Sequence, residues 1–380
     1  MNFLRPARET LDRLLPGLDK QLADIPLLDL EKPGNEGLAL FRAAGGPGLL
    51  VPSDLGGLGA SMVEAVQVQR AVGSRSPSLA VATTMHHFSV ASLVALDAAG
   101  DGLEWAMLEA LATNHWLLSS GFAEGRPGQH ILTPTMRATA VDGGLLVNGT
   151  KKPCSLTWSM DLMSASVAVA DPDGGPDRMA VVLIAATSGG IERRPFWKSW
   201  VLGGAESDEV VLHDVSVPEA FVFYPSDGPS MDPIQARGFI WFELLISAAY
   251  IGAASGLVER VLAGGRGSAE DRTLLAIELE SANAALERVA ATASSADADG
   301  DNDDLDDLLA HALYVRYGAE RAIERVAMAA AAVGGGMAFI GSSDVAYLLA
   351  ASRALAFHPP SRSGASEPLA RHLVGGGLSL

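Results

Sequence analysis

Cysteine and positive charge are what this sequence has least of. Cys154 is the only cysteine in 380 residues, which excludes an intrachain disulfide or a thiolate cluster and favours a reducing compartment. We therefore expect no metal site. The chain carries 27 Lys and Arg against 45 Asp and Glu, a formal net charge of −18. Binding to nucleic-acid phosphates requires clustered cations, so we expect no nucleic-acid partner.

Long apolar runs and a targeting pattern are also missing. No stretch of about 18 uninterrupted apolar residues is present, and the opening MNFLRPARETLDRLL lacks the charged, apolar and small-residue order of a signal peptide. These absences predict a cytoplasmic protein without a membrane partner. Strand and helix patterns do not alternate, which argues against Rossmann and barrel enzymes. The three glycines at 334–336 follow a helical pattern rather than a strand, so they are not a dinucleotide-binding fingerprint.

The hydrophobic periodicity divides the chain into three parts. Apolar residues recur three and four apart in the first part, as in ETLDRLLPGLDKQLADI, and in the last, as in FIWFELLISAAYIGAASGLVERVLA, which predicts helices. The middle part has short β-branched runs such as MRATAV and EVVLHDVSV, which predict strands. We predict an α+β protein: an N-terminal helical domain over 1–115, a small sandwich-like or barrel-like β-domain over 116–228, and a C-terminal four-helix bundle over 229–380.

Four motifs, taken in their order, resemble those of the acyl-CoA dehydrogenase superfamily over essentially the whole chain. LVPSDLGGLGAS (50–61) is similar to the family's P-x-x-x-G-G-x-G turn, and FAEGRPGQHI (122–131) to its flavin loop T-E-P-x-x-G-S-D. LLVNGTKKPCSLTW (145–158) resembles I-N-G-x-K-x-W-I-T-N, and LGGAESDEVVLHDVSVP (202–218) resembles the motif that closes the β-domain. The resemblance implies a flavoprotein that binds FAD, or FMN in the case of a monooxygenase.

The same resemblance assigns the residues that bind the flavin. Ser155 stands where the family has the threonine whose hydroxyl reaches flavin N5, and Arg266 where it has an arginine near the adenine end of FAD. The glycines of AVGGGMAF (332–339) resemble a segment that reaches the flavin of a neighbouring subunit, which implies a homodimer or homotetramer. The cofactor-binding residues implied in this way are Phe122, Ala123, Glu124, Gly128, Gln129, Cys154, Ser155, Arg266, Gly334 and Gly335.

The activity implied by the resemblance is α,β-dehydrogenation of an acyl thioester, with hydride transfer to flavin N5 and an electron-transfer flavoprotein as partner. This reaction needs a carboxylate base opposite the flavin, but Pro359 occupies the place of the usual C-terminal glutamate. We expect the base at Glu243, because an acid within the apolar FIWFELLISAAYIG needs either a partner or a function. The substrate-binding residues that we expect are His87, Ser207 and Phe242.

Two alternatives stay open. A related branch of the same fold uses reduced flavin and oxygen, lacks the glutamate, and places a β-domain serine and a C-terminal histidine near the flavin. Ser155 and His358 fill those places, and the partner is then a flavin reductase. An imidazole at that position can hydrogen-bond or deprotonate the reactants, although a loop histidine can also cap the preceding helix. The second alternative is a non-catalytic homologue without flavin. We predict the dehydrogenase.

Overall fold

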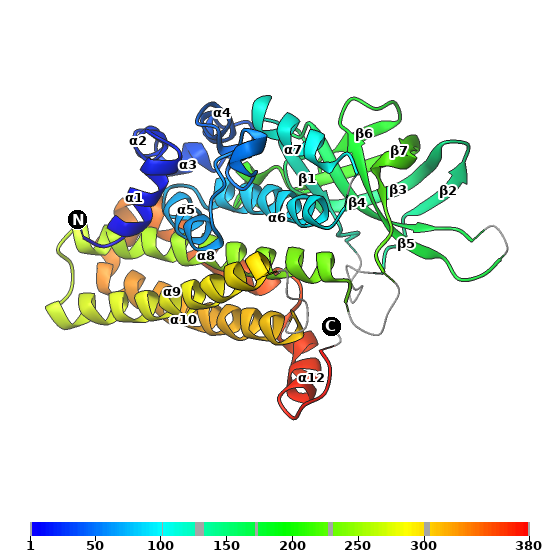
Figure 1. The fold of residues 1–380 in the computed structure, drawn as a ribbon. Helices are drawn as coiled ribbons and strands as arrows, with labels where there is room; N and C mark the ends of the chain where they lie inside the picture. Colours follow the sequence, from blue (N-terminus) through cyan, green and yellow to red (C-terminus); the bar gives the residue numbers. More distant parts are fainter. Residues whose placement is uncertain are drawn as a thin grey trace.

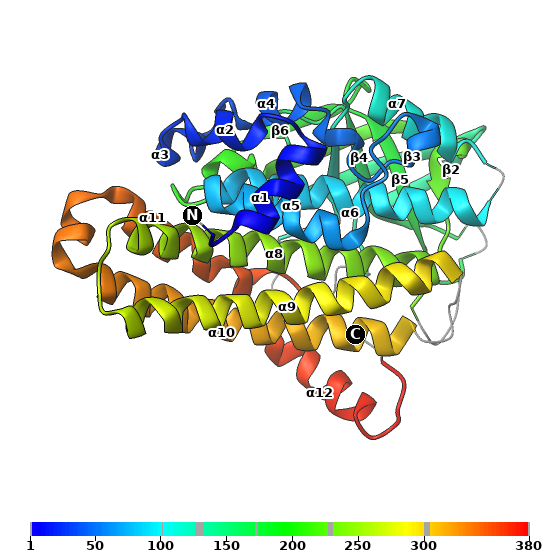
Figure 2. The same cartoon turned by 60° about the vertical axis from the view of Figure 1, so that its left-hand side comes forward.

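The computed structural model of the protein describes residues 2–100, 102–125, 133–171, 174–226, 231–299 and 305–378. Figure 1 shows helices in the N-terminal part, a sheet at one end of the molecule, and long helices in a layer beneath the N-terminal helices. The long helices still form one layer in the rotated view of Figure 2. The prediction of an α+β protein built from helices, a sheet and helices again is confirmed.

The N-terminal part surrounds two longer helices with short ones. The α-helices before the sheet are α1 (Arg5–Leu14), α2 (Leu18–Ala23), α3 (Leu27–Leu30), α4 (Gly37–Ala43), α5 (Met62–Arg75), α6 (Pro77–Ala99) and α7 (Glu104–Thr113). Helix α5 begins at a capping box between Ser61 and Glu64. Ser76 caps α6 by accepting the Leu79 N–H. These two caps fix where the two longer helices begin.

The β-domain is one connected sheet rather than two packed sheets. Its strands are β1 (Leu118–Gly121), β2 (Arg137–Val141), β3 (Gly144–Cys154), β4 (Leu162–Val169), β5 (Arg178–Ala185), β6 (Ile191–Arg194), β7 (Asp208–Pro218) and β8 (Val222–Phe223). Their order is β6-β7-β3-β2-β4-β5-β8, with β1 also paired to β4. Strand β4 pairs in parallel with β1 and β2, while the other pairs are antiparallel. Every residue of β4 is buried, as expected for a strand covered on both faces.

The C-terminal part is a layer of long helices. They are α8 (Pro233–Ala263), α9 (Ala269–Asp299), α10 (Leu305–Gly341), α11 (Ser343–Ala351) and α12 (Arg362–His372). Helix α9 extends through the start of the acidic segment SSADADGDNDDLDD (294–307), and α10 begins before that segment ends. Helix α12 projects from the layer in both views (Figures 1 and 2).

Helix α8 is the central element of the molecule. It packs against α5, α6, α9 and α10, and small residues let the backbones of α5 and α8 approach closely. A Cβ atom on Gly252 would lie 2.4 Å from the Arg70 carbonyl oxygen, and one on Gly73 would lie 2.2 Å from that of Ala249. Both glycines are therefore required for the packing that positions α8 beneath the sheet and α6.

Three helices among the described residues are long and apolar enough to cross a membrane, judged by length and composition alone: α6, α8 and α10. In α8, 94% of the most apolar window is buried inside the protein, whereas in α10 the buried share is 28%. The apolar character of α8 is thus explained by internal packing. That of α10 leaves an exposed apolar surface.

Candidate functional site

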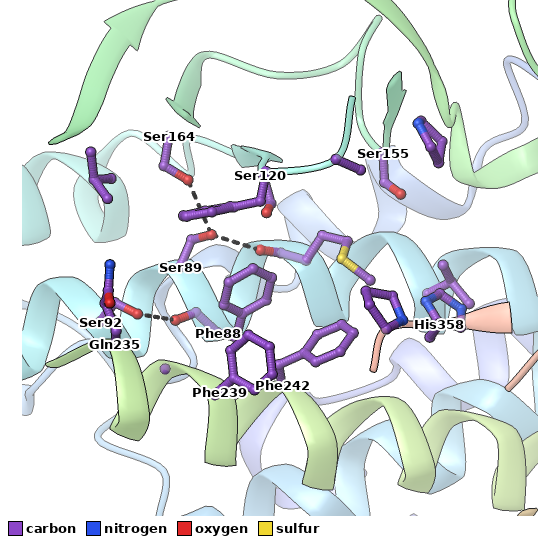
Figure 3. Close-up of a pocket in the computed structure, with 18 of the residues that line it drawn as sticks. Phe88, Ser89, Ser92, Ser120, Ser155, Ser164, Gln235, Phe239, Phe242 and His358 are labelled. Atoms are coloured by element: carbon purple, nitrogen blue, oxygen red, sulfur yellow. Dashed lines mark hydrogen bonds between the residues drawn. The ribbon is translucent and has the colours of Figure 1, made fainter. Parts of the chain in front are cut away.

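A cavity of about 580 Å³ lies between the sheet, α6 and the first half of α8. Figure 3 shows its wall, with side chains from β1 and β4 above and from α6 and α8 below. The segment between α11 and α12 closes one end through Ala354, Phe357, His358 and Pro359. The volume falls in the range of small-molecule sites, about 300–1,000 Å³.

Aromatic rings form one wall of the cavity. Phe242 lies at the centre, with ring centroids 5.4 Å from Phe88 and 6.2 Å from Phe239. Phe122, which follows β1, lies 6.2 Å from Phe88. Residues 239 and 242 are three apart on α8, so they share one helix face. This wall is apolar and suits a planar or aliphatic ligand.

Serine hydroxyls lie along the opposite part of the wall (Figure 3). Ser89 and Ser92 donate to the carbonyl oxygens of Met85 and Phe88, each at 3.0 Å, and Ser164 donates to the carbonyl oxygen of Ser119 at 3.2 Å. A backbone carbonyl accepts only, so these hydroxyl protons are spent inside the protein. The hydroxyl oxygens remain as acceptors for a donor in the cavity.

Two serines from the β-domain meet at the end of the cavity near His358. Ser155 follows β3 and Ser207 precedes β7, and their hydroxyl oxygens are 2.9 Å apart. The backbone of Ser155 is held by Ser119, whose hydroxyl donates to the Ser155 carbonyl oxygen at 2.6 Å. The pairing of β3 with β7 therefore brings two motif residues, distant in sequence, to one point.

His358 and Tyr250 form a hydrogen-bonded pair beside these serines. The Tyr250 hydroxyl lies 2.9 Å from His358 Nε2. Burial, and then the positive charge of Arg316, lower the pKa of His358 to about 3. Burial raises the pKa of Tyr250 above its usual value. At neutral pH the imidazole is therefore uncharged and the phenol keeps its proton. Because Nε2 is paired with the Tyr250 hydroxyl, Nδ1 is the ring atom left for a ligand.

Seven of the site residues predicted from the sequence line this cavity, and most of them belong to the motifs that resemble the acyl-CoA dehydrogenase superfamily. The structure brings together Phe122, Ala123, Glu124, Ser155, Ser207, Phe242 and His358. Glu124 differs from the others because its carboxylate is hydrogen-bonded within the β-domain. It accepts hydrogen bonds from the backbone N–H groups of Thr135 and Met136 and, at 2.8 Å, from Lys151 Nζ. Its side chain stabilises the β-domain, and only the neighbouring backbone is free to meet a ligand.

Glu243 does not line the cavity. It is fully buried on another face of α8, one residue and about 100° of helix rotation from Phe242, and its Oε2 lies 3.1 Å from Nε of the buried Arg316. Burial raises the pKa of its carboxyl group, and the positive charge of Arg316 opposes this rise. The carboxylate thus has a partner in the helical layer rather than a position opposite a ligand.

Two further residues suggested by the sequence are enclosed in the core. Cys154 is fully buried, with Sγ 3.0 Å from the Ser119 hydroxyl oxygen, and burial raises its thiol pKa to about 11. His87 is fully buried between Phe41 and His86, with ring centroids 5.7 and 5.2 Å away. Neither residue lines the cavity.

Three of the implied cofactor-binding residues gather at the opposite end of α8. Arg266 follows α8, and Gly334 and Gly335 lie near the end of α10, where Gly335 at φ +77° interrupts the helix. Phe242 and Ala263 are 21 residues apart on α8, about 30 Å along its axis. These residues are therefore too distant to contact a ligand in the cavity of the same subunit. Gly128 and Gln129 lie outside the described residues.

Sequence reasoning missed Tyr250, the α6 serines and Arg316. Tyr250 lies eight residues after Phe242 on one helix, so the periodicity that identified the face could have included it. Ser89 and Ser92 lie four and seven residues after Met85 on α6, which places all three on one face of that helix, so they could likewise have been found from spacing. Arg316 had no such signal, because its contacts are with residues 39 to 44 positions away and with Glu243.

Comparison with known proteins gives one relative of full length. The isobutylamine N-hydroxylase of Streptomyces viridifaciens is 46% identical over 385 residues, which cover 100% of both chains. The dibenzothiophene monooxygenase of Rhodococcus erythropolis is 27% identical over 231 residues, covering 58% of this chain and 53% of that protein. No family model matches the chain.

Solved structures with the same fold cover nearly the whole chain. KijD3 in complex with FMN and dTDP-3-amino-2,3,6-trideoxy-4-keto-3-methyl-D-glucose has a TM-score of 0.83 at 20% identity, over 98% of this chain and 94% of that one. FMN-bound TdsC from Paenibacillus sp. A11-2 has a TM-score of 0.79 at 18% identity, over 100% and 99%. A nitrososynthase from Micromonospora carbonacea var. africana has 0.81 at 19%, over 99% and 98%. At these identities the likeness shows the fold alone.

Proposed function

The chain belongs to the flavin-dependent monooxygenases of the acyl-CoA dehydrogenase fold, and on that premise we propose that it N-hydroxylates a small primary amine. The identity of 46% over the full length of an isobutylamine N-hydroxylase carries this proposal. The overall reaction converts an amine, dioxygen and reduced flavin into a hydroxylamine, water and oxidised flavin. Oxygen is the oxidant and reduced flavin the electron donor, so atoms and electrons balance.

The prediction of an acyl-thioester dehydrogenase is wrong. The full-length relative is an N-hydroxylase and the partial relatives are monooxygenases, whereas the dehydrogenase reaction requires a carboxylate base at the flavin. Pro359 occupies the usual place of that base, and Glu243 faces Arg316 instead of the cavity. The alternative reading, oxygenation with reduced flavin, agrees better with the relatives.

The cavity fits a flavin ring and a small substrate together. Ser155 and Ser207 supply hydroxyl groups at one end, and the backbone of Phe122 and Ala123 borders the same space. Reduced flavin bound there would supply the chemistry by activating dioxygen. We favour FMN over FAD, because KijD3 and TdsC, which share this fold, have structures in complex with FMN.

The residues of the chain contribute binding, orientation and a dry environment. The hydroxyl oxygens of Ser89 and Ser92 can accept the N–H groups of an amine, since their own protons are used by Met85 and Phe88. An uncharged His358 adds no positive charge near the amine and has no acidic proton to give it. The lone pair of the amine nitrogen therefore stays free to react. The phenylalanine wall excludes water, which would otherwise divert the oxidant. Together these features favour a short alkylamine bound as the neutral base.

The partners are part of the proposal. A separate flavin reductase would supply reduced flavin, because the relatives of this branch are expected to receive it from outside. We also propose a homo-oligomer, since Met337, Phe339 and Ile340 expose 50% or more of their surface at the end of α10. That face would bring Arg266 and Gly335 of one copy near another copy. We retain a cytoplasmic location as a proposal.

The test is a coupled reaction with short primary amines, isobutylamine among them. The purified protein, a flavin reductase, NADH, FMN and ¹⁸O₂ should yield the corresponding hydroxylamine carrying one ¹⁸O atom, detected by mass spectrometry. His358→Ala should lower the hydroxylamine formed per reduced flavin at least about tenfold, the size expected for one lost hydrogen bond. Flavin oxidation without any N-oxygenated product, over the whole amine series, would contradict the proposal.

A further inference from the structure

We propose that Arg316 is a positioning residue, which holds the His358 segment against the cavity from within the helical layer. The inference rests on the proposed function only for the role of His358. The segment concerned runs from Ser352 to Ser361, between α11 and α12. It supplies four cavity-lining residues, among them His358 and Pro359.

The guanidinium of Arg316 joins three points of this segment. Nη1 donates to the Pro360 carbonyl oxygen at 2.7 Å, and Nη2 donates to those of His358 at 2.5 Å and Leu355 at 3.3 Å. The neighbouring Tyr317 hydroxyl also donates to the Pro360 oxygen, at 2.9 Å. The backbone on both sides of the imidazole is therefore fixed by one planar side chain with several donors in a rigid fork.

Glu243 compensates the charge of this buried guanidinium. Both side chains have no solvent exposure, and they meet at 3.1 Å. Neither Glu243 oxygen has a hydrogen-bond donor in suitable geometry among the described residues, so the contact is an ion pair without a strong hydrogen bond. A buried charge without a counter-charge is costly. Glu243 thus makes it feasible for Arg316 to remain charged at this depth, and this accounts for an acid in an otherwise apolar helix.

The position of the His358 imidazole depends on the contacts of Arg316 with the backbone on both sides of it. Its ring contacts are Tyr250, at 2.9 Å through Nε2, and Phe242, at a centroid distance of 6.2 Å. Both partners lie on α8, and neither one fixes the backbone that carries the ring. Loss of the three Arg316 contacts would leave the segment with the single Tyr317 contact to Pro360 and with its own short turn, in which the His358 N–H donates to the Leu355 oxygen at 3.2 Å.

The first test measures the segment itself, without activity. Arg316→Met alone would leave Glu243 buried without a partner and destabilise the fold, so the main variant is Glu243→Leu with Arg316→Met, an apolar replacement of a buried pair. Hydrogen exchange of peptides covering 352–363 should become at least about tenfold faster than in the wild type, with α8 and α10 unchanged. Glu243→Asp, which keeps a counter-charge beside the guanidinium and leaves its three carbonyl contacts in place, should exchange within about twofold of the wild type. Unchanged exchange in the double variant would overturn the proposal.

The second test asks whether Arg316 acts through His358. In the double variant, hydroxylamine formed per reduced flavin should fall about tenfold, with little change in the KM for the amine. Arg316→Lys should behave in the same way, because a single ammonium nitrogen cannot reproduce the two separated nitrogens of the planar guanidinium that hold these carbonyl oxygens. Adding His358→Ala to the double variant should cause no further loss, since the two changes remove the same effect. Additive losses would contradict the proposal. If the wild type hydroxylates no amine, the proposed function fails while the exchange comparison still decides the anchoring.

Discussion

At the scale of single residues, two adjacent histidines show how little a residue type says without its surroundings. His86 accepts the Leu118 N–H at Nδ1 and bonds the Pro47 carbonyl oxygen through Nε2, both at 3.0 Å. In His87, both ring nitrogens lack a hydrogen-bond partner among the described residues. Burial lowers the pKa of His86 to about 4 and that of His87 well below its usual value. Both rings are therefore neutral in the folded protein.

His87→Phe should stabilise the protein, most of all at acidic pH. The folded-state pKa of His87 lies below the unfolded value of about 6.5, so protonation of the unfolded chain removes stability as the pH falls from about 7 to 5. Phe cannot take up this proton, and it leaves no unpaired polar atom in the core. Urea unfolding should show a gain of about 1 kcal/mol at pH 7 that grows towards pH 5.

His86→Phe is the matched control. It removes two hydrogen bonds to backbone groups and should destabilise by about 1–3 kcal/mol. If His87→Phe raises the KM for the amine, His87 binds substrate, as the sequence predicted. Equal losses of stability in both variants would contradict the environments described for the two rings.

The pH dependence of the reaction should follow the substrate rather than His358. The pKa of His358, lowered to about 3 by burial, keeps the imidazole neutral throughout the working range. An alkylammonium has a pKa near that of lysine, about 10.4, so its neutral fraction rises about tenfold per pH unit below that value. We expect kcat/KM for isobutylamine to rise in this way between about pH 6.5 and 8.5. A β-trifluorinated amine such as 2,2,2-trifluoroethylamine, which is largely neutral over this range because three fluorines withdraw electrons from nitrogen, should give a nearly flat profile. A shared inflection near the usual histidine pKa would contradict this prediction.

At the scale of elements, residues that matched motifs often turned out to hold the sheet together. Asn148 and Asp214 exchange two hydrogen bonds, at 2.9 and 2.8 Å, where the pairing of β3 with β7 shifts register. Gly149 lies beside them with φ +141°, and a Cβ there would come within 2.5 Å of Met136. Motif resemblance located these residues correctly, but only the strand pairing distinguishes a structural role from contact with a ligand.

Two helix-interior glycines should respond to alanine in opposite ways. Gly252→Ala places a Cβ 2.4 Å from the Arg70 carbonyl oxygen and should destabilise by about 1–3 kcal/mol, because α5 and α8 must separate. Gly318→Ala meets nothing within 4 Å and should stabilise by about 0.5–1 kcal/mol through helix propensity. Thermal unfolding measures both changes. A neutral result for Gly252→Ala would mean that the two helices adjust freely.

At the scale of the whole molecule, the face at the end of α10 should mediate self-association. Ile340 exposes 79% of its surface and Met337 exposes 70%, beyond what isolated apolar residues explain. Ile340→Asp should reduce the oligomer measured by light scattering to smaller species, because a charge in an apolar interface is costly. Trp105→Asp, at an exposed site on α7 on the opposite side of the molecule (Figures 1 and 2), should leave the size unchanged. A wild-type monomer would contradict the proposal.

The order of helices, strands and helices was determined by the sequence alone, because hydrophobic period and turn residues are local properties. The resemblance to a family also singled out Ser155, Ser207, Phe242 and His358, which line one cavity in the structure. The tertiary structure decided which neighbouring residue faces the cavity, since a single position on α8 separates Phe242 in the wall from Glu243 against Arg316. One residue turns a side chain by about 100°, and the partner that fixes the direction lies on another helix. The sequence does not show which residue of another helix lies beside Glu243. Only the packing of α8 against α10 shows that Glu243, the predicted base, is the buried counter-charge of Arg316.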